Sequence, residues 1–392
     1  MKQIFSHNRG LFIGLGVSLF VPSLGIVQKF LGTWFVGVYL AGGCVVLGLG
    51  LRYIPWERVY RLPRTLVYAL FGLTCGVLLV LFVVVYPLAD SGRIGPGSDH
   101  DDALNIAVTE LLHGRYPYYP RTYLDGPITK LPGAVFLAVP FVLMGTSAYQ
   151  NIVWSGIFVV VAGRLLGTTM RGLVLWWVIL LFSPVFWQRF VTGGDLLANN
   201  LYVVSFSLFL IGAMQRSAPR FSGLRLVCAA TLFGIGLSSR VQFLLLVPLM
   251  GAALSHMAGR GAALRSVGWS LVVWAGCTLP FYAYDPAGFA PLELVRMFDP
   301  FDAIVPWARI CIVGGSVGLA LVLAMMPGWE RDDDICVTFL ERSACVQAFP
   351  VVCGILFSCI ESGGFTMSFA DFGMNFLFFG ALATWARLFR DK

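Results

Sequence analysis

Charged residues are scarce in this sequence of 392 residues. Asp, Glu, Lys and Arg make up 12% of it, whereas a soluble domain usually carries about 25%. Hydrophobic residues make up 58% of the chain, and its mean hydropathy is +0.81. These values exclude a soluble globular protein, because a water-facing surface needs far more charge than this chain has.

The motifs of several protein classes are also missing. None of the nine cysteines belongs to a Cys-x-x-Cys pair, which argues against a zinc site or a disulfide framework. No P-loop, dinucleotide-binding glycine pattern or HExxH sequence occurs. The net charge of +7 comes from basic residues between apolar runs and not from a soluble basic face interleaved with aromatic residues. We therefore expect no nucleic-acid partner.

Long apolar runs recur from one end of the sequence to the other. Most approach the roughly 20 residues that cross a bilayer as a helix, and they are too continuous for barrel strands. The sequence therefore predicts an all-α fold, a polytopic transmembrane helical bundle of about twelve spans. The expected spans are residues 11–28, 34–51, 66–88, 148–164, 173–189, 196–214, 226–239, 241–256, 267–283, 304–326, 344–360 and 372–389.

The basic residues predict the orientation of these spans, because short loops rich in Arg and Lys belong in the cytoplasm. All basic clusters fall on one side if the stretch 131–146, interrupted by Pro and Gly, does not cross the membrane. We therefore expect twelve crossings, cytoplasmic termini, a cytoplasmic loop at 329–343 and an extracytoplasmic loop at 90–132. The basic clusters are residues 2–9, 52–64, 164–171, 216–225, 260–265 and 387–392.

The loop 90–132 carries the densest run of polar residues in the sequence. Three carboxylates and a histidine stand consecutively in it, just before an expected membrane-lying helix over residues 103–112. Negative charge is favoured at a helix N-terminus, but one carboxylate is enough to cap the helix. The others point to a functional role. The run consists of Asp99, His100, Asp101 and Asp102.

Two functional roles fit this run of acids. A carboxylate in a partly dry site has its pKa raised by burial and by neighbouring acids, which suits a general base that takes a proton from a hydroxyl. Alternatively, Asp99 and Asp101 could hold a divalent cation through their oxygens. No other cofactor is expected.

Cations and amides on the same expected face extend the candidate site. Arg240 lies between two apolar runs, where a charge needs a partner. It could be a snorkelling or ion-paired residue, or a phosphate clamp, for which arginine has the right bidentate geometry. Asp195 and Asn199 could line the same cavity or form hydrogen bonds between helices. The loop itself adds the cations Arg115, Arg121 and Lys130.

Three segments together resemble the GT-C superfamily of multi-span glycosyltransferases, which use polyprenyl-phosphate sugars. They are LLHGRYPY at 111–118, LPGAVFLAVPFVLMG at 131–145 and GLSSRVQFLLLVPLM at 236–250. The order of elements that resembles the superfamily extends over residues 66–256.

The resemblance is strongest to the branch that uses polyprenol-phosphate mannose. In that branch an Asp precedes the A…LL.G..PY pattern by a fixed interval, and counting back from Gly114 gives Asp101. The branch usually has Tyr four residues after the Asp, where this chain has Asn105. That departure leaves the sugar open.

The resemblance implies a fold and a division of the chain. The fold is a GT-C-like bundle with membrane-lying helices in its extracytoplasmic loop. Residues 1–65 would form an N-terminal two-span hairpin with a basic cytoplasmic loop, 66–256 the catalytic core, and 257–392 a C-terminal transmembrane region. The protein would lie in a bacterial cytoplasmic membrane.

The resemblance also implies an inverting sugar transfer. The donor would be a polyprenyl-phosphate sugar, and the acceptor a hydroxyl of a glycan or glycolipid. Asp101, with Asp102 and then Asp99 as competitors, would take the proton from the acceptor. Arg240, helped by Arg121, Lys130 or Arg115, would stabilise the departing lipid phosphate. Substrate contacts would come from His100, Asn105, Tyr118, Tyr119, Tyr123, Asp125, Asp195 and Asn199.

Other interpretations remain. The tyrosines of the loop could simply anchor it at the membrane interface. A twelve-span transporter is an alternative, although transporters usually show two similar halves and polar residues at mid-span. A flippase or scaffold without sugar-transfer chemistry is another, in which the acidic run would bind lipid headgroups.

Overall fold

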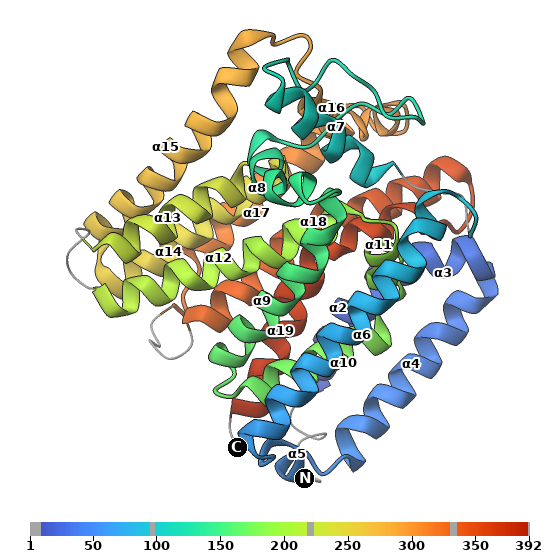
Figure 1. The fold of residues 1–392 in the computed structure, drawn as a ribbon, viewed down its shortest axis with the longest axis vertical. Coiled ribbons are helices and arrows are strands. Elements are labelled where there is room, and N and C mark those ends of the chain that lie inside the picture. The colour runs from blue at the N-terminus through green and yellow to red at the C-terminus, as the bar shows by residue number, and fades with distance from the viewer. Residues whose placement is uncertain (1–8, 95–98, 218–222, 330–334, 391–392) are drawn as a thin grey trace.

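The computed structural model describes residues 9–94, 99–217, 223–329 and 335–390 (Figure 1). Within them every regular element is a helix, and the one isolated β-bridge joins Arg121 to Pro127. The elements are α2 (Arg9–Phe20), η1 (Val21–Ser23), α3 (Leu24–Leu31), α4 (Thr33–Tyr53), α5 (Trp56–Tyr60), α6 (Arg64–Asp90), α7 (His100–Leu112), α8 (Pro132–Leu143), η2 (Ser147–Tyr149), α9 (Gln150–Leu165), α10 (Thr169–Phe182), α11 (Pro184–Val191), α12 (Asp195–Ser217), α13 (Leu224–Leu237), η3 (Val241–Leu245), α14 (Leu246–Ala258), α15 (Arg260–Tyr284), η4 (Ala290–Leu292), α16 (Glu293–Arg296), η5 (Asp299–Ala303), α17 (Ala308–Met325), α18 (Ile335–Ser362), η7 (Ser368–Gly373) and α19 (Met374–Arg390).

The prediction of an all-helical integral membrane protein is confirmed, but the count of twelve spans is not. Among the described residues, nine helical segments are long and apolar enough to cross a bilayer, or up to eleven if two bent pairs each count as one span. The expected span at 226–239 corresponds to α13, which has 14 residues and is shorter than a crossing usually requires.

A break at Pro184 explains a second difference between the expected spans and the observed helices. The expected span 173–189 is two helices, α10 and α11, bent by 89°. Ser183 stands before the proline and has φ −123° and ψ 82°, outside the helical region, as a residue before proline prefers. The apolar run therefore continues through this point while the helix does not.

The stretch 131–146, expected not to cross, forms α8, which is bent by 102° from the segment Ser147–Leu165 that follows it. A helix turned so far from its successor fits a re-entrant or surface-lying segment. The expected cytoplasmic loop 329–343 is shorter than predicted, because α18 begins at Ile335; residues 330–334 lie outside the described ranges. The described ranges also omit parts of the basic clusters, namely 2–8, 218–222 and 391–392.

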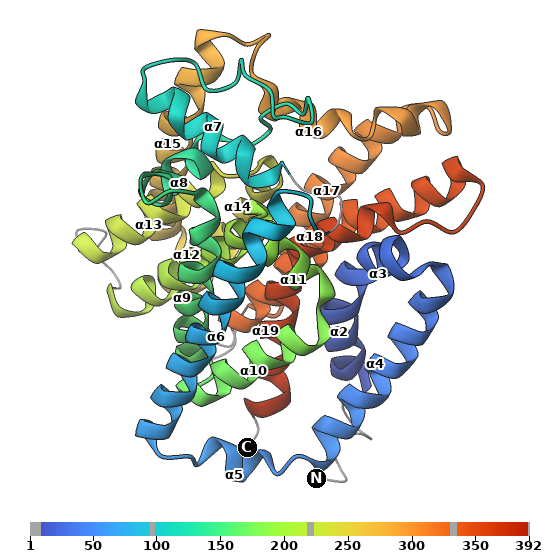
Figure 2. The ribbon, with the colours of Figure 1, turned by 45° about the vertical axis from the view of Figure 1, so that its right-hand side comes forward.

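The helices differ greatly in how much of their surface the protein itself covers. The most apolar windows of α12 and of the segment Ser368–Phe389 are each 89% buried, whereas those of α4 and α6 are 11% and 17% buried. Figure 2 shows α4 and α6 at the outside of the bundle. Their exposed side chains are mostly apolar, which suits contact with lipid tails.

Three of the shorter helices gather at one end of the molecule. In both views α7, α8 and α16 lie at the end opposite α5 and the C-terminal end of α19. The buried face of α7 packs against α8 through Leu104, Ala107 and Val108, which join one apolar cluster with Ala134 and Val135. This end of the molecule therefore carries the polar run at 99–102.

Gly133 fixes α8 against the end of α13. Its backbone N–H donates to the Ser238 carbonyl oxygen at 2.7 Å. A methyl group at this position would lie 2.3 Å from the Ile235 carbonyl oxygen and 2.6 Å from that of Ser238, so no side chain fits. The contact also fixes the position of Lys130, three residues earlier.

We expect Gly133→Ala to destabilise the protein by about 1–3 kcal/mol, the usual cost of overpacking. The measurement is the apparent unfolding temperature in detergent. Gly268→Ala in α15 is the matched control, because a methyl group there meets nothing within 4 Å. The Gly268→Ala protein should be as stable as the wild type or slightly more stable. Equal unfolding temperatures for the two variants would contradict the close approach of α8 and α13.

Candidate functional site

The expected helix after the polar run is confirmed as α7, which begins at His100 and ends two residues before Gly114. Asp99 is its N-cap residue, but no side chain caps the helix. Asp99 Oδ2 instead accepts a hydrogen bond from Thr122 Oγ1 at 2.6 Å. Asp101 and Asp102 are not N-cap residues, because both lie inside the first helical turn.

Asp101 is enclosed by protein, with 1% of its surface exposed. Tyr86 of α6 donates a hydrogen bond to its Oδ2 at 2.5 Å. Its Oδ1 is buried and receives no hydrogen bond from the described residues. Burial raises the pKa of Asp101 to about 6, although the Tyr86 hydrogen bond acts in the opposite direction. The structure thus contains a carboxylate with one tethered oxygen and one unused oxygen.

Asp102 and Asp99 differ from Asp101 in their surroundings. Asp102 is only half-buried, and desolvation with the nearby Asp90 raises its pKa. Asp99 is held by Thr122, and its Oδ1 lies 4.0 Å from His100 Nδ1. Of the three candidate bases, Asp101 is therefore the one most withdrawn from water.

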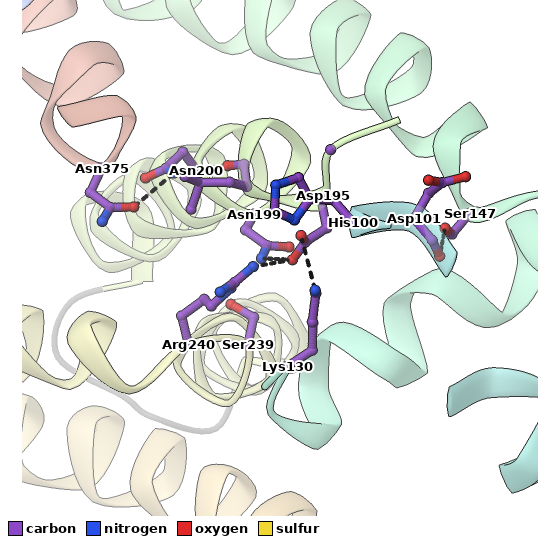
Figure 3. Close-up of polar contacts among 12 residues, drawn as sticks. His100, Asp101, Lys130, Ser147, Asp195, Asn199, Asn200, Ser239, Arg240 and Asn375 are labelled. Carbon is purple, nitrogen blue, oxygen red and sulfur yellow. Dashed lines mark hydrogen bonds and ion pairs between the residues drawn. The ribbon is translucent and has the colours of Figure 1, made fainter. Parts of the chain in front are cut away.

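A second group of buried charges surrounds Asp195, the first residue of α12 (Figure 3). Its Oδ2 accepts from Arg240 Nη2 at 2.5 Å and from Asn199 Nδ2 at 2.9 Å. Its Oδ1 lies 3.8 Å from Lys130 Nζ. Tyr202 in turn donates to Asn199 Oδ1 at 2.7 Å. Asp195, Asn199, Arg240 and Lys130 thus meet in one cluster.

This cluster has more positive than negative charge. Lys130 and Arg240, both more than nine-tenths buried, face the single carboxylate of Asp195. Arg240 Nε is buried and has no hydrogen-bond acceptor among the described residues. Burial lowers the pKa of Lys130, which nearby Asp195 opposes. Because buried charges need partners, the arrangement is suited to an additional anion.

A glycine turn connects the two parts of the site. Gly193, with φ 68°, precedes α12 by two residues, and a methyl group there would lie 3.0 Å from Cβ and Cγ of Asp101. His100 is drawn beside Asp195, while the carboxylate of Asp101 points away from this cluster (Figure 3). Burial, followed by the charges of Arg189 and Lys130, lowers the pKa of His100. His100 is therefore neutral beside the cations.

A largely apolar cavity of about 250 Å³ reaches this cluster at Arg240. Its walls come from η3, α16, α17, α18 and η7, with single residues from α12 and α19, and they are mostly aliphatic and aromatic. Apart from Arg240, the polar side chains of its lining are Gln242, Ser316 and Asn375. The cavity thus has a guanidinium at one point of an otherwise oily wall.

Several other predicted residues lie elsewhere. Arg115 makes a two-point ion pair with Glu110. Arg121 is exposed and lies 3.6 Å from Asp125. The structure does not bring these residues to the Asp195 cluster, because each cation meets an acid of its own loop first.

The tyrosines of the loop divide into two kinds. Tyr118 is buried and packs edge-on against Phe281 and Phe289, so the expectation that it stacks on a sugar ring is wrong for this structure. Tyr119 and Tyr123 are about 60% exposed and remain available for contacts. Asn105 does not face the cations; it hydrogen-bonds the segment at 146–147.

Asp99 and Asp101 do not come together as a cation site, since their side chains turn to Thr122 and Tyr86. Across the part of the chain that the structure describes, no three His, Cys, Asp or Glu side chains are grouped as a metal ion requires. Sequence reasoning missed Tyr86 and Thr146, which lie in or beside apolar runs with no polar pattern around them.

No protein-family model matches the chain, and no match was found among the curated proteins or the solved structures compared with it.

Removing the central anion should destabilise the protein strongly. We expect Asp195→Asn to cost about 3–5 kcal/mol, because Arg240 and Lys130 are then buried without a counter-ion. Adding Arg240→Gln to this variant should recover much of the loss. Apparent unfolding temperatures of the single and double variants in detergent test this.

Asp299→Asn is the control, since it removes an acid from a half-exposed pair with Arg309 and should cost at most about 1 kcal/mol. Equal losses in Asp195→Asn and Asp299→Asn would show that the buried cluster does not depend on its anion.

Proposed function

We propose that the protein is an inverting glycosyltransferase that moves a sugar from a polyprenyl-phosphate donor to the hydroxyl of a glycan or glycolipid. One observation carries the proposal. A buried carboxylate with an unused oxygen, Asp101, lies across a glycine turn from a buried cation cluster that opens into an apolar cavity at Arg240.

Asp101 is the proposed general base. A base for a hydroxyl should be ionised at working pH and yet retain affinity for the proton, and a pKa near 6 meets both needs. Oδ1 is the atom that accepts the proton, because Oδ2 is already bound by Tyr86. Asp101 is enclosed, so an acceptor reaches Oδ1 only when the surrounding segments move apart.

Arg240 and Lys130 are the proposed partners of the donor phosphate. A phosphodiester carries one negative charge, which would balance the one cation that Asp195 leaves uncompensated. The unpaired Nε of Arg240 offers a further donor. As negative charge grows on the departing phosphate, these preorganised cations stabilise it more than they stabilise the donor.

The cavity is the proposed site for the first part of the polyprenyl chain. An apolar chain needs an oily surface continuous with the phosphate site, and the wall that begins at Arg240 is of this kind. A water-soluble sugar nucleotide has no apolar chain to place in this cavity.

The reaction proceeds in one displacement. The acceptor oxygen attacks the anomeric carbon and forms the new glycosidic bond, while its proton passes to Oδ1 of Asp101. The bond from the anomeric carbon to the phosphate oxygen breaks, and its electron pair leaves with the polyprenyl phosphate. Attack from the side opposite the leaving group inverts the anomeric configuration.

The proposal places the site at the extracytoplasmic face of a bacterial cytoplasmic membrane, in a GT-C-like bundle of about twelve crossings. Its support is the pattern of basic clusters along the sequence. The gathering of α7, α8 and α16 at the end away from α5 agrees with that orientation.

We expect Asp101→Asn to reduce sugar transfer by at least about a thousandfold while the protein still folds and binds donor, because the amide cannot accept the proton. The measurement is product formation by protein in nanodiscs supplied with a panel of polyprenyl-phosphate hexoses and pentoses and a lipid-linked glycan acceptor.

Asp299→Asn is the control. It removes an acid that has no role in the proposed site, so this variant should keep the wild-type rate of transfer. An active Asp101→Asn variant would shift the role of base to Asp102 or Asp99, and activity in all three single variants would refute the scheme. Solute uptake into vesicles without any sugar transfer would instead indicate a transporter.

The rate should also depend on pH through Asp101. Only the ionised carboxylate accepts a proton, so kcat/KM should rise with pH, be half-maximal near pH 6 and level off above about pH 7. A pH profile of transfer by wild-type protein tests this. A midpoint near pH 4, the value of an ordinary exposed carboxyl, would contradict a buried base.

A further inference from the structure

A line of hydrogen bonds ends at the Oδ2 atom of Asp101. Asn105 Nδ2 donates to Thr146 Oγ1 at 3.4 Å, and Thr146 Oγ1 lies 3.1 Å from the Tyr86 hydroxyl. The Tyr86 hydroxyl donates to Asp101. These residues come from α7, from the turn before η2 and from α6, so three separate segments meet at one carboxylate.

The direction of each bond is fixed by its neighbours. The backbone N–H of Ser147 donates to Asn105 Oδ1 at 2.8 Å, which turns the amide N–H₂ of Asn105 towards Thr146. An ionised Asp101 can only accept, so the single proton of Tyr86 goes to it. Tyr86 is then left as an acceptor, and the hydroxyl proton of Thr146 is the one that it receives.

We propose that Asn105, Thr146 and Tyr86 form a one-way hydrogen-bond relay that holds Asp101 ionised and leaves Oδ1 as its reacting atom. The proposal rests on the proposed function for its role in transfer. The three are positioning residues, since they act through Asp101 and not on the substrate. Each donor in such a line polarises the next, which strengthens the final bond to the carboxylate.

The surroundings of Asp101 explain why a relay is needed. Two acids face Asp101, namely Asp90 from α6 and the neighbouring Asp102, and both disfavour the ionised form of Asp101. Tyr123 of the loop also senses this carboxylate, and it is neutral. Apart from the relay, the Gly193 turn covers Asp101 with no charge of its own. Donation through Tyr86 is thus the main stabilisation that the ionised form receives from these neighbours.

The decisive test is the titration of Asp101 itself, followed by difference infrared spectroscopy of the protonated carboxyl band and assigned with Asp101→Asn. We expect Tyr86→Phe to raise the midpoint by about one pH unit, because it removes the direct donor. Thr146→Val should raise it in the same direction by a smaller amount although it does not touch Asp101. Asn105→Ala tests the same upstream step if Thr146→Val does not fold.

Two controls distinguish an effect of the hydrogen-bond relay from an effect of altered side-chain packing. Thr146→Ser keeps the hydroxyl and its contact with the Ala148 N–H, so the midpoint should stay at the wild-type value. Thr109→Val removes a hydroxyl from the exposed face of α7, the helix that carries Asn105. Among the described residues this hydroxyl bonds only the Asn105 carbonyl, so its removal should also cause no shift. A shift in Thr146→Ser as large as that in Thr146→Val would point to packing and overturn the relay.

An unchanged midpoint in both Thr146→Val and Asn105→Ala would likewise overturn it, because Tyr86 would then act alone. In transfer assays at pH 6, Tyr86→Phe should lower kcat roughly fivefold, because a one-unit rise of the midpoint leaves that much less ionised Asp101, with little change in the KM for the donor lipid. The titration needs no turnover, so an absence of transfer by wild-type protein would refute the proposed function while leaving the relay to be judged by its own shifts.

Discussion

The carboxylate of Asp195 holds this end of the molecule together. It binds Arg240, which follows α13, and Lys130, which precedes α8, and it is itself the first residue of the deeply buried α12. Each of these segments would otherwise bring an unpaired charge into an apolar interior at a cost of several kcal/mol. The arrangement therefore favours one position of α8 relative to α12 and α13, and the absence of a side chain at Gly133 lets α8 approach the end of α13 in that position.

The two faces at the start of α7 have opposite electrostatic character. His100 senses Arg189, Lys130 and Arg240, whereas Asp101 senses Asp90 and Asp102. Two consecutive residues in the first turn of α7 therefore face different regions, one that favours anions and one that favours a proton. A reaction that expels an anion and takes up a proton needs both, and it needs them close together without direct neutralisation of one by the other.

Much of the fold and of the candidate site could be predicted from the sequence, wherever the pattern that indicates a feature lies within a short stretch of residues. The helix α7 follows from an apolar pattern that ends at Gly114, and the meeting of Asp195 with Arg240 follows from the rarity of charge in apolar runs. The break at Pro184 was also present in the sequence, but apolarity alone concealed it. Tyr86 was missed because its partner depends on how α6 packs beside α7, and Tyr118 was misjudged because the rings that bury it lie more than 160 residues further along the chain.

The burial of α12 and α19 has a consequence for biosynthesis. Asn200 of α12 donates a hydrogen bond to Asn375 of α19, a residue made 175 positions later. Until α19 emerges from the ribosome and enters the membrane, α12 must keep a polar surface among lipids or among temporary neighbours. Insertion can therefore proceed helix by helix as the chain grows, but the centre of the bundle closes only after translation has passed α19. During that interval the unfinished bundle is the form that membrane chaperones and proteases would meet.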